Sequence, residues 1–102
     1  MVARIDLAPE VGDDLDRIFV HVVRHDLDGA AARIREIVDA ISVLETSPMI
    51  GRPAAGARCE RRELIIGQRT RGCVALYRYA AAVDTLFVLA LRSQREAGYS
   101  HA

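Results

Sequence analysis

Hydrophobic spacing divides the chain into a helical first half and a strand-rich second half. Residues 2–7 alternate well enough for a short strand, and Ala8-Pro9-Glu10 is typical of a helix start, with Pro early and an acid in the first turn. From Val11 the apolar residues recur at helical spacing, which predicts an amphipathic helix ending near Asp26. Its apolar face comprises Val11, Leu15, Ile18, Phe19 and Val22, and its polar side comprises Asp14, Arg17, His21, Arg24 and His25.

A second helix follows after a tight turn. Asp28 is predicted to be its N-cap, and Ser47-Pro48 is predicted to stop it. Two helices joined in this way form an antiparallel hairpin. The predicted buried stripe comprises Ile34, Ile37, Val38, Ile41 and Leu44.

The pattern changes after Pro48. Residues 49–57 are rich in Gly, Pro and small side chains and are predicted to form a connecting loop, before a strand over residues 63–66. A turn over residues 67–72 then leads into a strand over residues 73–79. After a short turn ending at Asp84, the continuously apolar run at residues 86–91 is typical of a central strand buried on both faces.

These elements predict an α+β fold in the order strand, helix, helix, strand, strand, strand. The helical hairpin is expected to pack on one face of a small, mainly antiparallel sheet. With 102 residues, 51% of them hydrophobic and 27% charged, residues 1–102 are expected to form a single compact domain with a surface site.

Membrane insertion is not expected. The longest uncharged run, residues 85–91, is far shorter than the roughly 20 residues that a spanning helix needs. Residues 1–6 resemble no secretory signal, so a cytoplasmic location is expected.

Charge is distributed unevenly although the net charge is zero. Residues 1–51 carry 5 Arg and 10 acidic residues, whereas residues 52–102 carry 9 Arg and 4 acidic residues. The second half is therefore expected to present a cationic surface. Cys59 and Cys73 match neither a zinc pattern nor a disulfide framework, so we expect two structural thiols, no metal site and no cofactor.

Several short motifs occur in an order that carries a family resemblance. They are Leu44-Glu-Thr-Ser-Pro48, Gly51-Arg52-Pro53, Arg62-Glu63-Leu64, Val74-Ala-Leu-Tyr77-Arg78, Val88-Leu-Ala-Leu-Arg92, Gln94-Arg95-Glu96 and Tyr99. Over nearly the whole chain the sequence resembles the RelE/ParE family of toxins from type II toxin–antitoxin, or plasmid stabilisation, systems. The resemblance implies a RelE/ParE-like fold, growth arrest, and neutralisation by a cognate antitoxin that wraps the toxin.

The resemblance also implies one of two targets. RelE-like members cut messenger RNA on the ribosome, whereas ParE-like members block DNA gyrase. In the RelE-like pattern a catalytic Arg follows the strand-opening Gly by two positions, but here Val74 follows Gly72. Ser93 stands where RelE-like nucleases carry Arg and where many plasmid stabilisation relatives carry His. These departures favour gyrase inhibition, with a ribosome-dependent endoribonuclease, or a degenerate module that only binds antitoxin, as the alternatives.

RNA cleavage by a 2′-hydroxyl needs a proton acceptor, a proton donor and cations for the extra phosphoryl charge. If the chain is RelE-like, the candidate catalytic residues are Arg92, Arg95 and Tyr99, and the sequence offers no evident base. The candidate target-binding residues are Arg62, Arg69, Arg71, Arg92 and Arg95. The cationic strands would also suit an acidic, amphipathic antitoxin segment that folds on binding. Whether the toxin also forms a homodimer, or only a hetero-oligomer with antitoxin, is left open.

Overall fold

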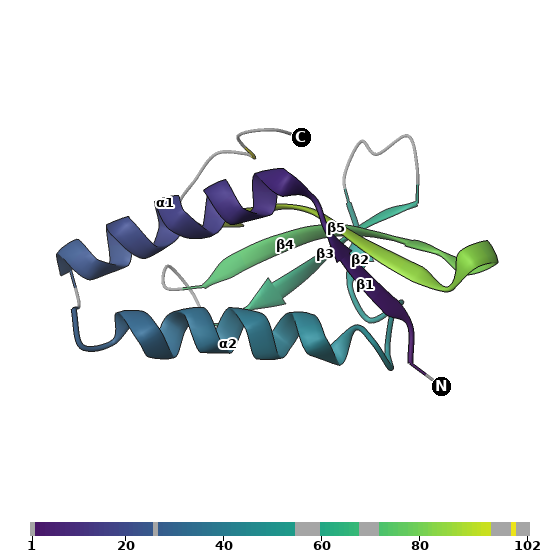
Figure 1. The fold of residues 1–102 in the computed structure, drawn as a ribbon, viewed down its shortest axis with the longest axis horizontal. Helices are drawn as coiled ribbons and strands as arrows, with labels where there is room; N and C mark the ends of the chain where they lie inside the picture. Colours follow the sequence, from purple (N-terminus) through teal and green to yellow (C-terminus); the bar gives the residue numbers. More distant parts are fainter. Residues whose placement is uncertain (1, 26, 55–59, 68–71, 95–98, 100–102) are drawn as a thin grey trace.

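The described residues of the computed structural model form one mixed sheet covered by two helices (Figure 1). The structure describes residues 2–25, 27–54, 60–67, 72–94 and 99. The elements are β1 (Arg4–Leu7), α1 (Pro9–His25), α2 (Ala30–Val43), β2 (Arg52–Pro53), β3 (Arg61–Ile66), β4 (Cys73–Ala80), the 3-10 helix η2 (Ala81–Val83) and β5 (Thr85–Ser93).

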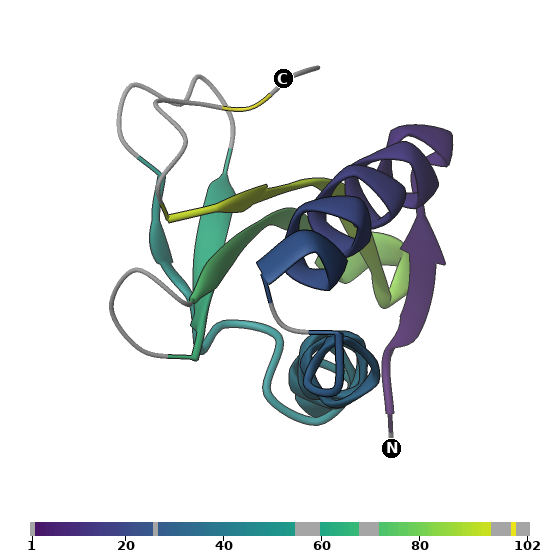
Figure 2. The ribbon, with the colours of Figure 1, turned by 90° about the vertical axis from the view of Figure 1, so that its left-hand side faces the viewer.

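The strands lie in the order β1-β5-β4-β3-β2. β1 pairs with β5 in parallel, and the other three pairings are antiparallel. Both helices lie on the same side of the sheet (Figure 2). The predicted α+β class, the helical hairpin and the mainly antiparallel sheet are therefore confirmed.

The core lies between the helices and one face of the sheet. Of the three inner strands, β4 and β5 supply most of its sheet side, which confirms the prediction that the apolar run at residues 86–91 lies in an inner strand. The buried core residues are Val11, Ile18, Ile37, Ile41, Leu44, Ile66, Cys73, Ala75, Tyr77, Leu86, Val88 and Leu91. Cys73 is thus a buried thiol, as predicted, whereas Cys59 lies outside the described residues.

The bounds of the elements differ from the predicted ones at several points. Asp28 is not the N-cap of α2: Gly29 occupies that position and makes no side-chain cap hydrogen bond. The helix ends at Val43, before Ser47-Pro48, because Leu44 to Thr46 continue as tight turns. The predicted loop contains the edge strand β2, which has only two residues and so shows no alternation pattern.

The predicted apolar faces of the helices are too wide. Phe19 is 42% exposed and Val38 is 48% exposed, because each helix packs on a single layer and buries only the stripe that faces it. The opposite error concerns Asp14, which was assigned to the polar side but is fully buried. In the described part of the chain, no helix is long and apolar enough to cross a membrane.

Candidate functional site

Charged residues gather on the sheet face opposite the helices, which we call the outer face. The core residues of β3 and β4 alternate with a second set of side chains that point away from the helices. The outer face comprises Arg61, Glu63 and Ile65 of β3, Val74, Leu76 and Arg78 of β4, and Phe87, Ala90 and Arg92 of β5.

Glu63 is the centre of a polar cluster on this face. The Tyr99 hydroxyl donates a hydrogen bond to Glu63 Oε2 at 2.5 Å, and Arg92 Nη2 lies 4.0 Å from the same oxygen. Arg52 Nη2 lies 3.4 Å from Glu63 Oε1. The Arg92 guanidinium also lies over the Tyr99 ring, 5.2 Å from its centroid. We call Glu63, Arg52, Arg92 and Tyr99 the Glu63 cluster.

Strand register brings these side chains together from distant parts of the sequence. Arg52 of β2 is the direct partner of Glu63 on β3, and Arg92 of β5 is the partner of Val74 on β4. Val74 in turn pairs with Ile65, which lies two residues beyond Glu63 and therefore on the same face. The cluster thus bridges three strands, and Tyr99 joins it from the C-terminal segment.

The loop that carries Arg52 is fixed by its own hydrogen bonds. The Gly51 N–H donates to the Tyr77 hydroxyl oxygen at 2.8 Å, and Arg62 Nη1 donates to the Gly51 carbonyl at 2.6 Å. Tyr77 is fully buried, so this anchor belongs to the core. The backbone just before Arg52 is therefore held through both the N–H and the carbonyl of Gly51.

The environment of Tyr99 keeps its hydroxyl protonated. Burial raises the pKa of Tyr99, and its hydrogen bond to the Glu63 carboxylate raises it further, whereas Arg92 acts in the opposite direction. Tyr99 is therefore a weak acid that holds its proton against a carboxylate. The side chain of Glu63 is 12% exposed and that of Arg92 is 17% exposed, so both charges are largely withdrawn from solvent.

The structure brings together two of the predicted site residues, Arg92 and Tyr99. Arg62 is placed differently, since its guanidinium binds the carbonyl oxygens of Gly51 and Met49 and holds the loop before β2. The remaining predicted residues, Arg69, Arg71 and Arg95, lie outside the described residues. Among the residues that are described, no three His, Cys, Asp or Glu side chains are grouped so as to hold a metal ion.

Sequence reasoning did not identify Glu63 or Arg52 as site residues. Both belong to motifs that carry the family resemblance, Arg62-Glu63-Leu64 and Gly51-Arg52-Pro53, but neither motif states what the side chain contacts. Alternation along β3 could have placed Glu63 on the face away from the core. The pairing of Arg52 with Glu63 depends on the two-residue strand β2, which no periodicity reveals.

The arrangement contains a carboxylate, two guanidinium groups and a phenol. Such a set can neutralise an anion or move a proton, provided that the carboxylate is free to accept one. Here each oxygen of Glu63 already faces a donor: Oε1 faces Arg52, and Oε2 faces Tyr99 and Arg92. A role in proton transfer would therefore require Tyr99 to leave Glu63 first.

Comparison with known proteins finds one matching family model. A family model described as the ParE toxin of the type II toxin–antitoxin system parDE matches residues 5–98. No curated protein matches the sequence.

Two solved structures share the architecture. A chain of the chromosomal ParDE toxin–antitoxin system from P. aeruginosa superposes with a TM-score of 0.74 at 19% sequence identity, over 90% of this chain and 96% of that chain. A chain of the toxin–antitoxin complex RelBE2 from Mycobacterium tuberculosis gives a TM-score of 0.58 at 14% identity, over 92% of this chain and 100% of that chain. At these identities the likeness shows the fold alone.

Proposed function

This chain belongs to the ParE toxin family of type II toxin–antitoxin systems, and we propose that it arrests growth by binding DNA gyrase and blocking its action. The observation that carries this proposal is the match of the ParE toxin model to residues 5–98, which include both helices and all of the described sheet except Arg4, the first residue of β1. The partner that neutralises the toxin is an antitoxin, in keeping with the toxin–antitoxin assemblies named for the two structural neighbours.

The geometry of the Glu63 cluster supports binding over catalysis. A general base must reach the proton that it removes, but both oxygens of Glu63 face donors from the protein. The position of the RelE-like catalytic Arg is occupied by Val74, which is 1% exposed and supplies no cation. The described residues of the Glu63 cluster thus form a set of mutually paired groups in place of an open catalytic centre.

Ribosome-dependent RNA cleavage is the second candidate, and one observation favours it. Arg92, Tyr99 and Glu63 place a cation, a proton donor and a carboxylate within a single cluster. If Tyr99 moved away during binding to the ribosome, Glu63 could accept the proton of a 2′-hydroxyl. This would supply the base that the sequence alone does not identify.

Rates of DNA and protein synthesis distinguish the two candidates. We expect DNA synthesis to fail first, by pulse labelling in the minutes after the toxin is induced without antitoxin. The purified toxin is expected to inhibit supercoiling by gyrase. Early failure of protein synthesis, with cut messenger RNA, would support the nuclease instead.

Variants of the Glu63 cluster make the same distinction by another route. Glu63→Gln, and a double variant with Arg95→Ala and Tyr99→Ala, should abolish a nuclease and leave antitoxin binding intact. Toxicity that survives both changes would exclude cleavage through these residues. Arg35→Ala, an exposed position on α2, is the matched control.

We also propose a cytoplasmic location, because gyrase and the ribosome are both found there. In this setting the toxin would contribute to plasmid stabilisation, since cells that lose the antitoxin supply would stop growing. Loss of plasmid-free cells from a growing culture, measured with and without the toxin gene, tests this role.

A further inference from the structure

The two edges of the sheet differ in how well they can pair with a further strand. β2 forms one edge, and it has only two residues, one of which is Pro53. So short a strand pairs poorly, and its proline has no N–H to donate. β1 forms the opposite edge, and its four residues include neither proline nor glycine. Figure 2 shows β1 at the right-hand border of the molecule, so this edge is the better candidate for pairing.

The backbone groups of β1 alternate between β5 and the free edge. The N–H groups of Arg4 and Ala8 donate to carbonyl oxygens at β5 and just before it, at 3.0 Å and 2.9 Å. The N–H and carbonyl groups of Ile5 and Leu7 therefore point the other way, toward the edge. No turn or loop among the described residues hydrogen-bonds to the backbone of these two residues. The edge thus offers donors and acceptors that a further strand can bind.

The side chains of β1 alternate as well. Ile5 packs against the core, so Leu7 lies on the same, helix-facing side of the strand. Leu7 is nevertheless 56% exposed. Arg4 and Asp6 lie on the opposite side, where Arg4 Nε is 3.1 Å from Asp6 Oδ1. The free edge therefore presents an exposed aliphatic side chain on one side and a pair of opposite charges on the other.

The order Arg4, Ile5, Asp6 is complementary to itself. When two such strands run antiparallel with Ile5 opposite the partner's Ile5, Arg4 of each chain lies opposite the partner's Asp6. Opposite charges that face each other across two strands stabilise a sheet, whereas like charges destabilise it. A register with Asp6 opposite the partner's Asp6 would bring two carboxylates together. Charge therefore selects the register centred on Ile5, which has the two-fold symmetry of a closed dimer.

The same register suits the backbone. The two copies of Ile5 exchange hydrogen bonds directly, because the N–H and carbonyl of each face the edge. Arg4 and Asp6 then occupy non-hydrogen-bonded positions, where facing side chains lie closest. At Ala3 the edge is already covered, since its N–H donates to the Glu45 carbonyl oxygen at 2.8 Å. The pairing is thus limited to a few residues around Ile5, which predicts a weak dimer that forms at high concentration.

A second copy of this chain fits the edge better than an acidic segment does. β1 carries one basic and one acidic side chain on the same side, on either side of Ile5 in the sequence. A strand of acidic residues would satisfy Arg4 but would be repelled by Asp6. The matching strand needs a base and an acid in the same alternation, and this chain itself supplies that pattern.

We propose that β1 is a dimerisation edge, at which two copies of this chain pair antiparallel about Ile5 and join their sheets. Arg4 and Asp6 of the two chains alternate in a single cluster, and Leu7 is covered on the other side of the strand. The two outer faces point in the same direction, because facing residues of paired strands project to the same side of a sheet. The inference goes beyond the proposed function and involves neither gyrase nor antitoxin.

Sedimentation of the purified toxin over about a hundredfold range of concentration tests the proposal. We expect the wild type to shift from monomer to dimer as the concentration rises. Arg4→Asp and Asp6→Arg each turn both facing pairs into like charges, so each should weaken the dimer about 10-fold or more. The double variant with both changes restores opposite charges and should dimerise within about threefold of the wild type.

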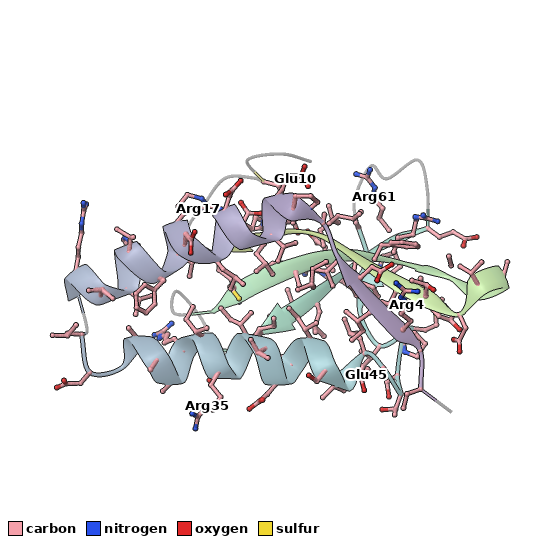
Figure 3. The ribbon with its side chains drawn as sticks, in the orientation of Figure 1. Arg4, Glu10, Arg17, Arg35, Glu45 and Arg61 are labelled. Carbon is pink, nitrogen blue, oxygen red and sulfur yellow. The ribbon has the colours of Figure 1, made fainter. Side chains whose placement is uncertain are left out.

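A mixture of the two single variants tests the register directly. Arg4→Asp leaves two acids on β1 and Asp6→Arg leaves two bases, so each strand repels its own copy and complements the other. We expect native mass spectrometry of an equimolar mixture to show more heterodimer than either homodimer. The control reverses the exposed charges Arg35 and Asp39 of α2 and should dimerise as the wild type does. Figure 3 shows Arg35 projecting from α2, at the other end of the view from Arg4.

Folding is measured separately from pairing. Arg4 and Asp6 form an exposed ion pair, which contributes little to stability, so both single variants should melt near the wild-type temperature when dilute. A wild type that stays monomeric throughout, or single variants that dimerise as the wild type does, would overturn the proposal. A monomeric toxin whose Arg4 and Asp6 variants lose antitoxin affinity would assign the edge to the antitoxin and would equally refute it. Failure of the toxin to inhibit gyrase would leave each of these results unchanged.

Discussion

Asp14 on α1 accepts a hydrogen bond at 3.0 Å from the backbone N–H of Leu91 on β5, across 77 positions of sequence. Its other oxygen lies 3.1 Å from Arg17 Nη2, and Arg17 Nη2 also lies 3.3 Å from the Leu91 carbonyl oxygen. Two helical side chains thus serve both backbone groups of Leu91, as a neighbouring strand would.

The need for this contact arises from the topology. β1 pairs with β5 only as far as Val88, whereas β5 continues to Ser93. Tyr77 pairs with Val88 and Leu76 with Ala90, so β5 has one extra residue, Leu89, opposite β4. Beyond this bulge β5 no longer pairs with β1, and Asp14 and Arg17 of α1 cover the exposed edge of β5 instead.

We expect Asp14→Ala to lower the free energy of unfolding by about 1–3 kcal/mol, because it leaves the N–H of Leu91 buried without its acceptor. Urea denaturation measures the loss. Asp16→Ala, at an exposed position of the same helix, is the matched control and should change stability by less than about 0.5 kcal/mol. Equal effects of the two substitutions would show that the bond to Leu91 contributes little.

Asp14 also shows why part of the structure was not predicted from the sequence. The helices are predicted by apolar positions that recur at helical spacing, and β5 is predicted by a continuously apolar run at residues 86–91. The helical spacing assigns Asp14 to the polar side of α1. Its burial arises because it binds the edge of β5, which exists only in the assembled sheet.

In the candidate site too, some residues were identified from the sequence and others depend on the assembled sheet. Arg92 and Tyr99 were identified from the motifs that carry the family resemblance, and the structure places them together. Glu63 and Arg52 were missed because their contact is set by the register of β2 against β3. The facing pair of Arg61 and Arg78 likewise depends on register, which local sequence patterns do not specify.

Gly51 is required by the close approach of two other groups. A Cβ at this position would lie 2.6 Å from the Tyr77 hydroxyl oxygen and 2.8 Å from the Glu63 carbonyl oxygen. We therefore expect Gly51→Ala to destabilise the fold by about 1–3 kcal/mol. Gly12→Ala is the control of opposite sign: nothing lies within 4 Å of its Cβ in α1, and alanine should stabilise that helix by about 0.5–1 kcal/mol. Thermal melts of both variants check the prediction, and it is wrong if Gly51→Ala melts at or above the wild-type temperature.

The bond between Tyr99 and Glu63 predicts a change in the ionisation of tyrosine. Glu63→Gln removes the negative charge beside the Tyr99 hydroxyl, so the pKa of Tyr99 should fall toward its usual value. Ultraviolet absorbance of the phenolate, compared between variants with and without Tyr99→Phe, measures it. Asp84→Asn is the control, since Asp84 accepts from the Tyr79 hydroxyl at 2.6 Å and raises the pKa of Tyr79 instead. An unchanged Tyr99 titration in Glu63→Gln would contradict the assigned contact.

The buried thiol of Cys73 should lower the free energy of unfolding at alkaline pH. Burial raises the pKa of its thiol from 9.0 to about 11, with Glu36 adding to the shift and Arg33 opposing it. Because the folded-state pKa is the higher one, the protonated thiol favours the folded state, and this contribution is complete below pH 9 and is lost as pH rises to 11. The full loss is about 3 kcal/mol at 1.4 kcal/mol for each unit of pKa.

The measurement is the difference in unfolding free energy between the wild type and Cys73→Ala at pH 7, 9, 10 and 11. Tyrosines 77, 79 and 99 also have raised pKa values, but they are present in both proteins and cancel in the difference. We expect the difference to stay constant from pH 7 until about pH 9 and then to shift in favour of Cys73→Ala, since above pH 9 only the wild type must either keep a buried thiol protonated or bury a thiolate. A difference that stays flat to pH 11 would mean that the Cys73 thiolate is accommodated in the fold, in conflict with the burial of this β4 residue in the core.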